Sequence, residues 1–431
     1  PEDLKAFVDA AHALGLMVLL DVVYNHFGPE GNYLHVYCPQ FFNAKHETPW
    51  GAAINFDGEG NRTVRDFYVH NALFWIEEYH FDGLRLDAIH AIRDESPRHI
   101  VAEIAGALHD GPGRERQIHL VLENDANEAR YLERDAKLAP LCASAQWNDD
   151  LHHAAHALVT GERDGYYADY ADAPLARLGR ALAEGFVYQG EASAFRGGVA
   201  RGEPSAQLPP TAFVSFLQTH DQIGNRAFGE RLHALAGERH ERTALACLLL
   251  SPHIPMLFMG EEFAASTPFL FFCDFGPELA QAITEGRRRE FAHFAKFSDE
   301  AARACIPDPG SAATFAASKL NWSEREQGTH RARLDLVRKL LALRHQYIVP
   351  RLKGAQGRGL LEIINRALRV EWKLGDGARL RLFAHFGAEP VSVPQRLTGE
   401  LVYCDGARNA AGGNLELDPG AVHVLIGSAD D

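Results

Sequence analysis

The sequence contains few cysteines, and they form no recognisable pattern. Only six occur among 431 residues, and no two of them make a Cys-x-x-Cys pair. This distribution excludes a disulfide-stapled scaffold and a cysteine-ligated zinc site, and it favours a reducing compartment, the cytoplasm. The six are Cys38, Cys142, Cys247, Cys273, Cys305 and Cys404.

Other signals are absent as well. No apolar run is long enough to span a bilayer, so we expect no membrane partner. There is no His-Glu-x-x-His motif and no glycine-rich phosphate loop beside a predicted strand, and no ligand set requires a metal ion or a cofactor. Acidic residues outnumber basic ones: the chain has 43 Lys and Arg and 58 Asp and Glu, which gives a net charge of −15. This balance argues against a nucleic-acid partner, whereas a neutral sugar is compatible with it.

What the sequence does contain is a repeated alternation of buried strands and helices. Polar residues recur at the C-terminal ends of the strands, a pattern typical of doubly wound sheets and of (β/α)8 barrels. The chain length and the spread of these residues over at least four strand ends favour an α/β TIM-type barrel. The expected strands cover residues 16–23, 84–87, 119–123, 140–146, 212–219 and 254–259.

The predicted domains divide the chain near residue 350. Six strand–helix units do not close an eight-stranded barrel, and the chain opens at Pro1 without Met. We therefore expect two leading strands upstream of Pro1, and we assign residues 1–350, with loop insertions, to the catalytic barrel. Residues 360–431 alternate in short strands between turns such as Gly375-Asp376-Gly377, which predicts a small antiparallel β-sandwich domain.

The segment Phe81–His90 carries the first candidate chemistry. In a strand, Leu84 and Leu86 lie on one face, and Arg85 and Asp87 lie on the other. One interpretation is a structural ion pair. The other is a nucleophilic carboxylate that Arg85 keeps ionised by lowering the pKa of Asp87.

Two further carboxylates follow later strands. Glu123 ends the strand HLVLE, and Asp221 comes just after the strand over 212–219. Three carboxylates in one pocket suit cleavage of a glycosidic bond, where one attacks, one donates a proton, and a third stabilises the charged transition state.

Four ordered motifs resemble the signature regions of the α-amylase superfamily, glycoside hydrolase family 13. They are DVVYNH (21–26), GLRLDAIH (83–90), LVLEND (120–125) and LQTHDQIGN (217–225). The resemblance implies Asp87 as the nucleophile, Glu123 as the general acid/base and Asp221 as the transition-state stabiliser. It also implies a set of substrate-binding and supporting residues: Asp21, Asn25, His26, Arg85, His90 and His220.

Within that superfamily, several stretches resemble the maltooligosyltrehalose trehalohydrolase family. They include WGAAINFDG (50–58), WNDDLHH (147–153), PFLFFCDF (268–275) and EGRRREF (285–291). The resemblance implies a retaining hydrolase whose oligosaccharide substrate, maltooligosyltrehalose, is cut at the α-1,4 bond next to the terminal trehalose. Trp147, Asp149, Asp150 and the loop over 268–291 are expected to shape the leaving-group side. A glucan branching or debranching enzyme and a non-catalytic glucan-binding protein are the alternatives.

Overall fold

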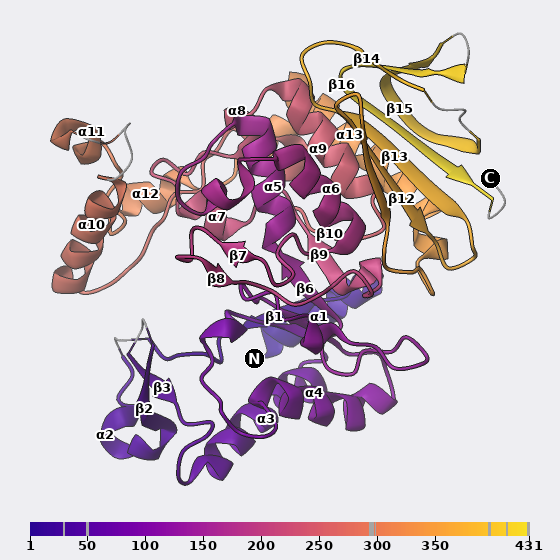
Figure 1. Ribbon diagram of the computed structural model, residues 1–431. Helices are drawn as coiled ribbons and strands as arrows, with labels where there is room; N and C mark the ends of the chain where they lie inside the picture. The colour runs from indigo at the N-terminus through magenta and orange to yellow at the C-terminus, as the bar shows by residue number, and fades with distance from the viewer. Residues whose placement is uncertain are drawn as a thin grey trace.

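The computed structural model contains a six-stranded parallel sheet and a six-stranded antiparallel sheet, with helices packed between and around them (Figure 1). It describes residues 1–28, 31–48, 51–292, 297, 299–394, 398–410 and 413–428. Pro49 and Trp50 therefore lie outside the described residues, and with them the first residue of the WGAAINFDG stretch.

The parallel sheet has six strands, which confirms the six strands expected from the sequence; four of them are shorter than expected, β4 is displaced by one residue, and β6 begins and ends later than expected. Its order is the chain order, and every neighbouring pair is parallel. All strand C-termini therefore meet at one rim, as in a barrel. The strands are β1 (Leu19–Val22), β4 (Gly83–Leu86), β5 (His119–Leu122), β6 (Ala145–Asn148), β9 (Phe213–Ser215) and β10 (Ile254–Pro255).

Helices connect and cover most of these strands. Alternate strand residues, such as Leu84 and Leu86, pack outward against α3 and α4, while Val121, Ala145 and Val214 form a separate inner cluster. Only a short 3-10 helix (Ala129–Leu132) lies between β5 and β6, so this unit lacks the α-helix that we expected. The main helices are α1 (Glu2–Ala13), α3 (Asn61–Glu78), α4 (Ile100–Asp110), α5 (Asp149–Thr160), α6 (Pro174–Glu184), α9 (Glu238–Leu250) and α13 (Gly328–Tyr347).

Three insertions interrupt the alternation of strands and helices, and each contains secondary structure of its own. The loop over 33–61 holds α2 (Leu34–Tyr37) and the hairpin β2 (Phe42–Thr48) and β3 (Gly51–Ile54). The glycine-rich loop near 196 holds a short hairpin of β7 (Ala192–Ser193) and β8 (Val199–Ala200). The segment after β10 forms a lobe of α10 (Pro277–Phe291), α11 (Glu300–Ala304) and α12 (Ala312–Ala317), so the EGRRREF stretch is helical rather than loop.

The C-terminal strands confirm an antiparallel β domain. They form one hydrogen-bonded sheet, in which β16 pairs with three partners. One face joins the core that α5, α6, α9 and α13 supply, and the other encloses a separate apolar cluster. The strands are β11 (Leu360–Ile364), β12 (Ala367–Lys373), β13 (Arg379–His385), β14 (Val391–Val393), β15 (Glu400–Asn409) and β16 (Leu415–Gly427).

Within the described part of the chain, no helix combines the length and the apolar character needed to cross a membrane.

Candidate active site

The candidate site is built around a buried arginine at the rim where the parallel strands end. Arg85 of β4 is 5% exposed, and it lies opposite Asp21 of β1 and Val121 of β5 in the strand register. Because its neighbours Leu84 and Leu86 pack outward, Arg85 points to the inner face of the sheet. Its guanidinium stacks 4.0 Å from the centre of the Trp147 ring.

Arg85 contacts carboxylates from three neighbouring strand ends. Its Nη1 donates to Asp21 Oδ1 at 2.7 Å and to Asp87 Oδ1 at 2.8 Å. Its Nη2 donates to Glu123 Oε2 at 2.6 Å. One guanidinium therefore holds Asp87 and Glu123 side by side.

Asp87 is held as a carboxylate. Asn25 Nδ2 donates to the Asp87 carboxylate at 3.0 Å and to its backbone carbonyl at 2.7 Å. Burial alone would raise the pKa of Asp87, but the Asn25 amide and the Arg85 charge outweigh it and hold the pKa below its ordinary value. A lowered pKa is what the prediction of Asp87 as a nucleophile requires.

Glu123 has the opposite electrostatic character. Burial raises the pKa of Glu123 to about 7; Arg85 and the Ala88 backbone N–H oppose this rise, and the nearby charges of Asp221 and Asp87 add to it. The Ala88 N–H donates to Glu123 Oε2 at 2.8 Å, across a turn in which Ala88 takes the left-handed conformation at φ 40°. The two carboxyl groups thus differ in protonation near neutral pH, as a nucleophile and a general acid must.

Asp221 lies on the short helix α7 (His220–Gly224), which follows β9. A capping box fixes the start of this helix, because Thr219 accepts from the helix backbone and Gln222 accepts from the Thr219 N–H. Asp221 and Glu123 line the same open cleft of about 460 Å³. The structure therefore brings all three predicted carboxylates to one centre.

The predicted histidines stand around this centre. His26 is partly buried beside Asn25, and burial lowers its pKa although the charge of Asp87 acts in the opposite direction. His220 Nε2 lies 3.5 Å from Asp221 Oδ1, and its ring meets Trp147 edge to face at 6.2 Å. His90 lines the cleft, and its Nδ1 lies 3.2 Å from the Asp125 backbone nitrogen.

Of the two aspartates at the start of α5, one faces the cleft and the other does not. Asp149 lines the cleft, where Gln222 donates to it at 3.3 Å. Burial, and after it the charge of Glu123, raises the pKa of Asp149 well above its ordinary value. We expected Asp150 to bind substrate, but its side chain is fully buried and does not face the cleft. Its carboxylate accepts from the backbone nitrogens of Val187 and Tyr188 at 2.7 and 2.9 Å.

The far wall of the cleft comes from residues that we did not single out. Arg201 directly follows β8 of the β7–β8 hairpin. Its guanidinium donates to Asp150 at 2.8 Å and to the Asp125 carboxylate at 3.1 Å. Arg196 also pairs with Asp125. Tyr166 and Phe195 add aromatic rings to this wall. The only sequence signal was the glycine-rich character of the segment around 196–202, which marks a loop and not a binding function.

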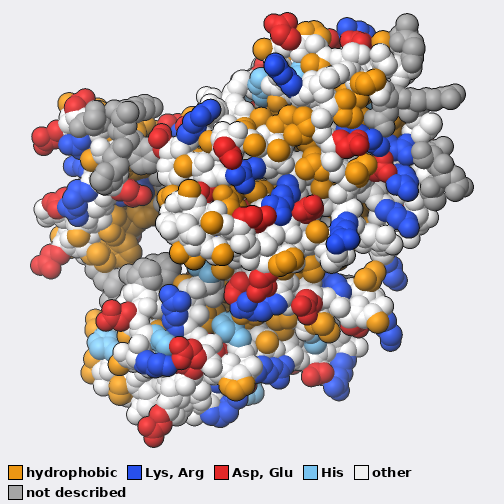
Figure 2. Space-filling model, viewed as in Figure 1, with side chains coloured by type: hydrophobic (Ala, Val, Ile, Leu, Met, Phe, Trp, Pro, Cys, Tyr) orange, Lys and Arg blue, Asp and Glu red, His pale blue; other side chains and the backbone are white. Residues whose placement is uncertain are grey.

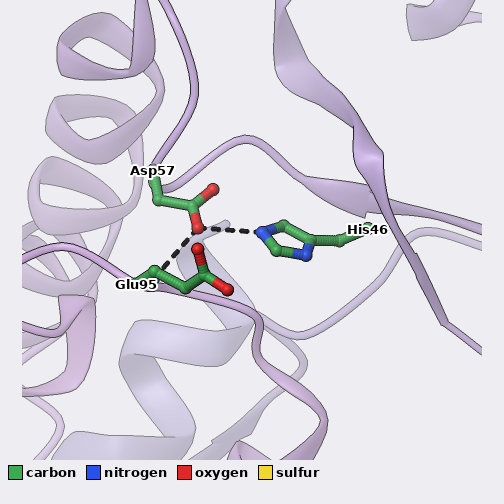
Figure 3. A group of neighbouring side chains, drawn as sticks. All are labelled: His46, Asp57 and Glu95. Atoms are coloured by element: carbon green, nitrogen blue, oxygen red, sulfur yellow. Dashed lines mark hydrogen bonds and ion pairs between the residues drawn. The ribbon is translucent and has the colours of Figure 1, made fainter.

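A group that could hold a metal ion stands outside the cleft, between the β2–β3 hairpin and the loop after β4. Figure 3 shows His46, Asp57 and Glu95 turned toward one another. His46 Nε2 lies 2.9 Å from Asp57 Oδ2, which also accepts from the Glu95 backbone nitrogen at 3.0 Å. Asn43 donates to the other oxygen at 2.7 Å, and Glu95 pairs with Lys45. These donors already satisfy the Asp57 carboxylate, so the group joins the β2–β3 region to the loop after β4 through hydrogen bonds.

Comparison with known proteins supports these observations. A malto-oligosyltrehalose trehalohydrolase of Deinococcus radiodurans is 45% identical over 348 residues, which are 80% of this chain and 55% of that protein. A protein of the same name from Arthrobacter ramosus is 40% identical over 434 residues, and the match covers 99% of this chain and 71% of that protein. The chain thus spans between about half and three quarters of the length of these relatives.

A solved structure and a family profile also match. The crystal structure of a Salmonella typhimurium protein, provisionally assigned as an alpha amylase, aligns with a TM-score of 0.91 at 44% identity. The alignment covers 99% of this chain and 70% of that chain. Residues 363–424 match a family described as a domain of unknown function, DUF3459. The six-stranded parallel sheet thus forms part of a barrel of the α-amylase fold, and the chain belongs to the malto-oligosyltrehalose trehalohydrolase family of glycoside hydrolases.

Proposed function

We propose that this protein is a retaining glycoside hydrolase that cleaves the α-1,4-glucosidic bond next to the terminal trehalose of maltooligosyltrehalose. The products are free trehalose and a maltooligosaccharide. The observation that carries the proposal is the pair Asp87 and Glu123, bridged by Arg85 and shifted in opposite directions in pKa. Retaining enzymes keep their two carboxyl groups about 5–5.5 Å apart, and a shared guanidinium favours such closeness over the wider spacing of inverting enzymes.

In the first step, the ionised Asp87 attacks the anomeric carbon while the protonated Glu123 donates its proton to the glycosidic oxygen. The glycosidic bond breaks, trehalose leaves, and the glucan stays bound to Asp87 as an ester. In the second step, Glu123 takes a proton from water, the water oxygen attacks the anomeric carbon, and Asp87 is released. Asp221 stabilises the positive charge that develops on the sugar in both steps.

The surrounding polar residues hold the sugar and the nucleophile in position. Arg85 orients Asp87 and lowers its pKa, and Asp21 and Asn25 fix Arg85 and the Asp87 loop. His26 and His220 are placed to bond the hydroxyls of the sugar that is attacked. Trp147 forms the floor under Arg85.

The trehalose unit occupies the cleft on the side of the loops after β5 and β6. This cleft presents His90 and Asp149 near Glu123, and its far wall carries the Asp125–Arg196 pair. Charged groups that already pair with one another offer fixed donors and acceptors to a neutral disaccharide.

Trehalose release from maltooligosyltrehalose tests the proposal. The intact protein is incubated with the substrate, and trehalose and maltooligosaccharide are quantified by chromatography, with the Asp87→Ala variant as the control. We expect equimolar products from the wild type and a loss of more than about a thousandfold in the variant, as for removal of a catalytic nucleophile. Formation or cleavage of α-1,6 branches without trehalose would favour the branching or debranching alternative, and binding without turnover would favour the non-catalytic one.

The proposal also covers the cellular location, the binding partners and the domains of the enzyme. Six free cysteines support a reducing, cytoplasmic location. The net charge of −15 supports a neutral oligosaccharide, and neither nucleic acid nor membrane, as partner. We assign residues 1–350 to the catalytic barrel and residues 360–431 to the accessory β domain.

A further inference from the structure

A second hollow opens at the C-terminal end of β10, and its lining is almost entirely apolar. It has a volume of about 380 Å³. Trp322, Phe315 and Met259 are 55%, 47% and 46% exposed, although a side chain of this kind normally gains by burial. We call it the aromatic groove and define it by its apolar lining: Met259, Phe269, Phe272, Phe315, Leu320 and Trp322.

The rings of the groove hold one another in place. Phe269 meets Phe272 edge to face with centroids 5.9 Å apart, and Phe272 meets Phe315 in the same way at 5.1 Å. Trp322 leans on the fully buried Phe263, with centroids 5.9 Å apart. Such edge-to-face networks fix ring orientation, so the walls are formed before any ligand arrives. In Figure 2 the α10–α12 lobe stands on the left, and hydrophobic side chains gather on its lower inner side.

The aromatic groove begins next to the catalytic centre. β10 is the sheet neighbour of β9, whose C-terminal end leads into the helix that carries Asp221. A Cβ added at Gly224 of that helix would lie 3.8 Å from the Phe269 ring, and the Phe269 N–H donates to the Gly229 carbonyl at 3.0 Å. The cleft proposed for trehalose extends from α7 over the loops after β5 and β6. The helix that carries Asp221 therefore borders both hollows, because Asp221 and Asn225 line the cleft and Gly224 lies against Phe269 of the groove.

The chemistry of the groove suits an uncharged glucan chain. The faces of a pyranose ring consist of C–H groups and stack on aromatic rings, while the hydroxyls at its edge remain in water. The groove has a single charged lining residue, Lys319, whose Nζ lies 4.8 Å from the centre of the Phe315 ring. A charged ligand would find little to pair with here.

We infer that the aromatic groove binds the maltooligosaccharide part of the substrate, on the side of the scissile bond opposite trehalose. This inference rests on the proposed function, which requires a glucan chain to extend beyond the attacked sugar. It assigns Phe269 and Phe272, in the loop over 268–291, to the glucan side, whereas the sequence resemblance led us to expect this loop on the leaving-group side.

Chain-length dependence tests the inference in the intact protein. Trp322→Ala and Phe315→Leu remove one half-exposed ring each and should leave the fold intact, which circular dichroism verifies. For each variant we measure kcat/KM on maltooligosyltrehaloses of increasing length. We expect the ratio of long-substrate to short-substrate kcat/KM to fall by about tenfold, as for truncation of an aromatic side chain at a binding surface. Phe74→Ala, which removes a 46% exposed ring on α3, should leave the ratio unchanged.

A binding readout separates this inference from the proposed reaction. Calorimetry with maltohexaose reports the affinity of the wild type and the two variants without any turnover. Weaker maltohexaose binding in both variants supports glucan binding by the aromatic groove. This holds even if the wild type releases no trehalose, and only the proposed reaction is then wrong. Wild-type maltohexaose affinity in both variants, together with an unchanged length ratio, overturns the inference and leaves the groove to another kind of partner.

Discussion

At the residue scale, the chemistry depends on how one buried guanidinium is shared. Arg85 bonds Asp87 and Glu123 at similar distances, yet the two carboxyl groups differ in pKa. The difference comes from their other neighbours, since Asp87 accepts from Asn25, whereas Glu123 is more deeply buried and lies near the charges of Asp221 and Asp87. A single arginine can therefore bond to both carboxyl groups while their pKa values remain different.

The pH–rate profile should show this asymmetry. Glu123 must be protonated to act as the acid, so kcat/KM should fall as the pH rises through about 7. Asp87 must be ionised, so the acid limb should lie below the ordinary Asp range. Asn25→Ala removes a donor to Asp87, and the acid limb should then move up by about one pH unit. The basic limb of the same variant is the internal control, and a shift of both limbs together would contradict this assignment.

At the element scale, helix α5 supplies one carboxylate to the cleft and one to the interior. Consecutive helical residues point about 100° apart, so Asp149 can face the cleft while Asp150 turns into the protein. Asp150 is fully buried and joins the helix start to the β7–β8 hairpin through Arg201. The hairpin wall of the cleft thus depends on a residue that touches no substrate.

Asp150→Asn should destabilise the protein strongly. The substitution keeps the shape of the side chain but removes a charge partner of Arg201, which is 5% exposed. Breaking a buried ion pair costs about 3–5 kcal/mol, and we expect a loss of that size in the free energy of unfolding measured with urea.

Asp172→Asn is the matched control for this change. Asp172 pairs with Arg177 at the surface, with its side chain 67% exposed. Exposed ion pairs contribute about 0–1 kcal/mol, so this variant should unfold close to the wild type. Equal effects of the two substitutions would show that Asp150 does not hold the hairpin.

At the scale of the whole molecule, the barrel and the β domain share one core. Trp372 of β12 is buried, and its indole N–H donates to the Leu182 carbonyl of α6 at 2.9 Å. Apolar residues of β12, β13 and β16 pack in the same cluster as those of α5, α6 and α9 (Figure 1). The two parts should therefore unfold as one cooperative unit.

Trp372→Ala tests this cooperativity. Truncation of a buried Trp costs about 3–5 kcal/mol, and calorimetry should show a single transition at a lower Tm, with activity lost in the same temperature range. Leu401→Ala, on β15 of the same sheet, removes a side chain that is 51% exposed and should change stability by less than about 0.5 kcal/mol. Two separate transitions would show independent domains.

Most of the strands, and the three carboxylates that we propose as catalytic, could be predicted from the sequence, whereas the loops could not. Strand alternation is local, so Leu84 and Arg85 could be assigned to opposite faces. The β2–β3 and β7–β8 hairpins and the α10–α12 lobe were missed, because their strands and helices are short and held by tertiary contacts rather than by a clear period.

The sequence by itself determined the alternating elements, the ordered motifs and the identity of the three carboxylates, because each depends on residues close together in the chain. Only the tertiary structure decided which of these groups share Arg85, that Asp150 lies in the interior, and that Arg201 reaches Asp125 across 76 positions. It also gathered Phe269, Phe272, Phe315 and Trp322 around one hollow and placed Phe269 against Gly224 of α7. Such contacts join residues far apart in the chain, and they follow from packing, which no local pattern encodes.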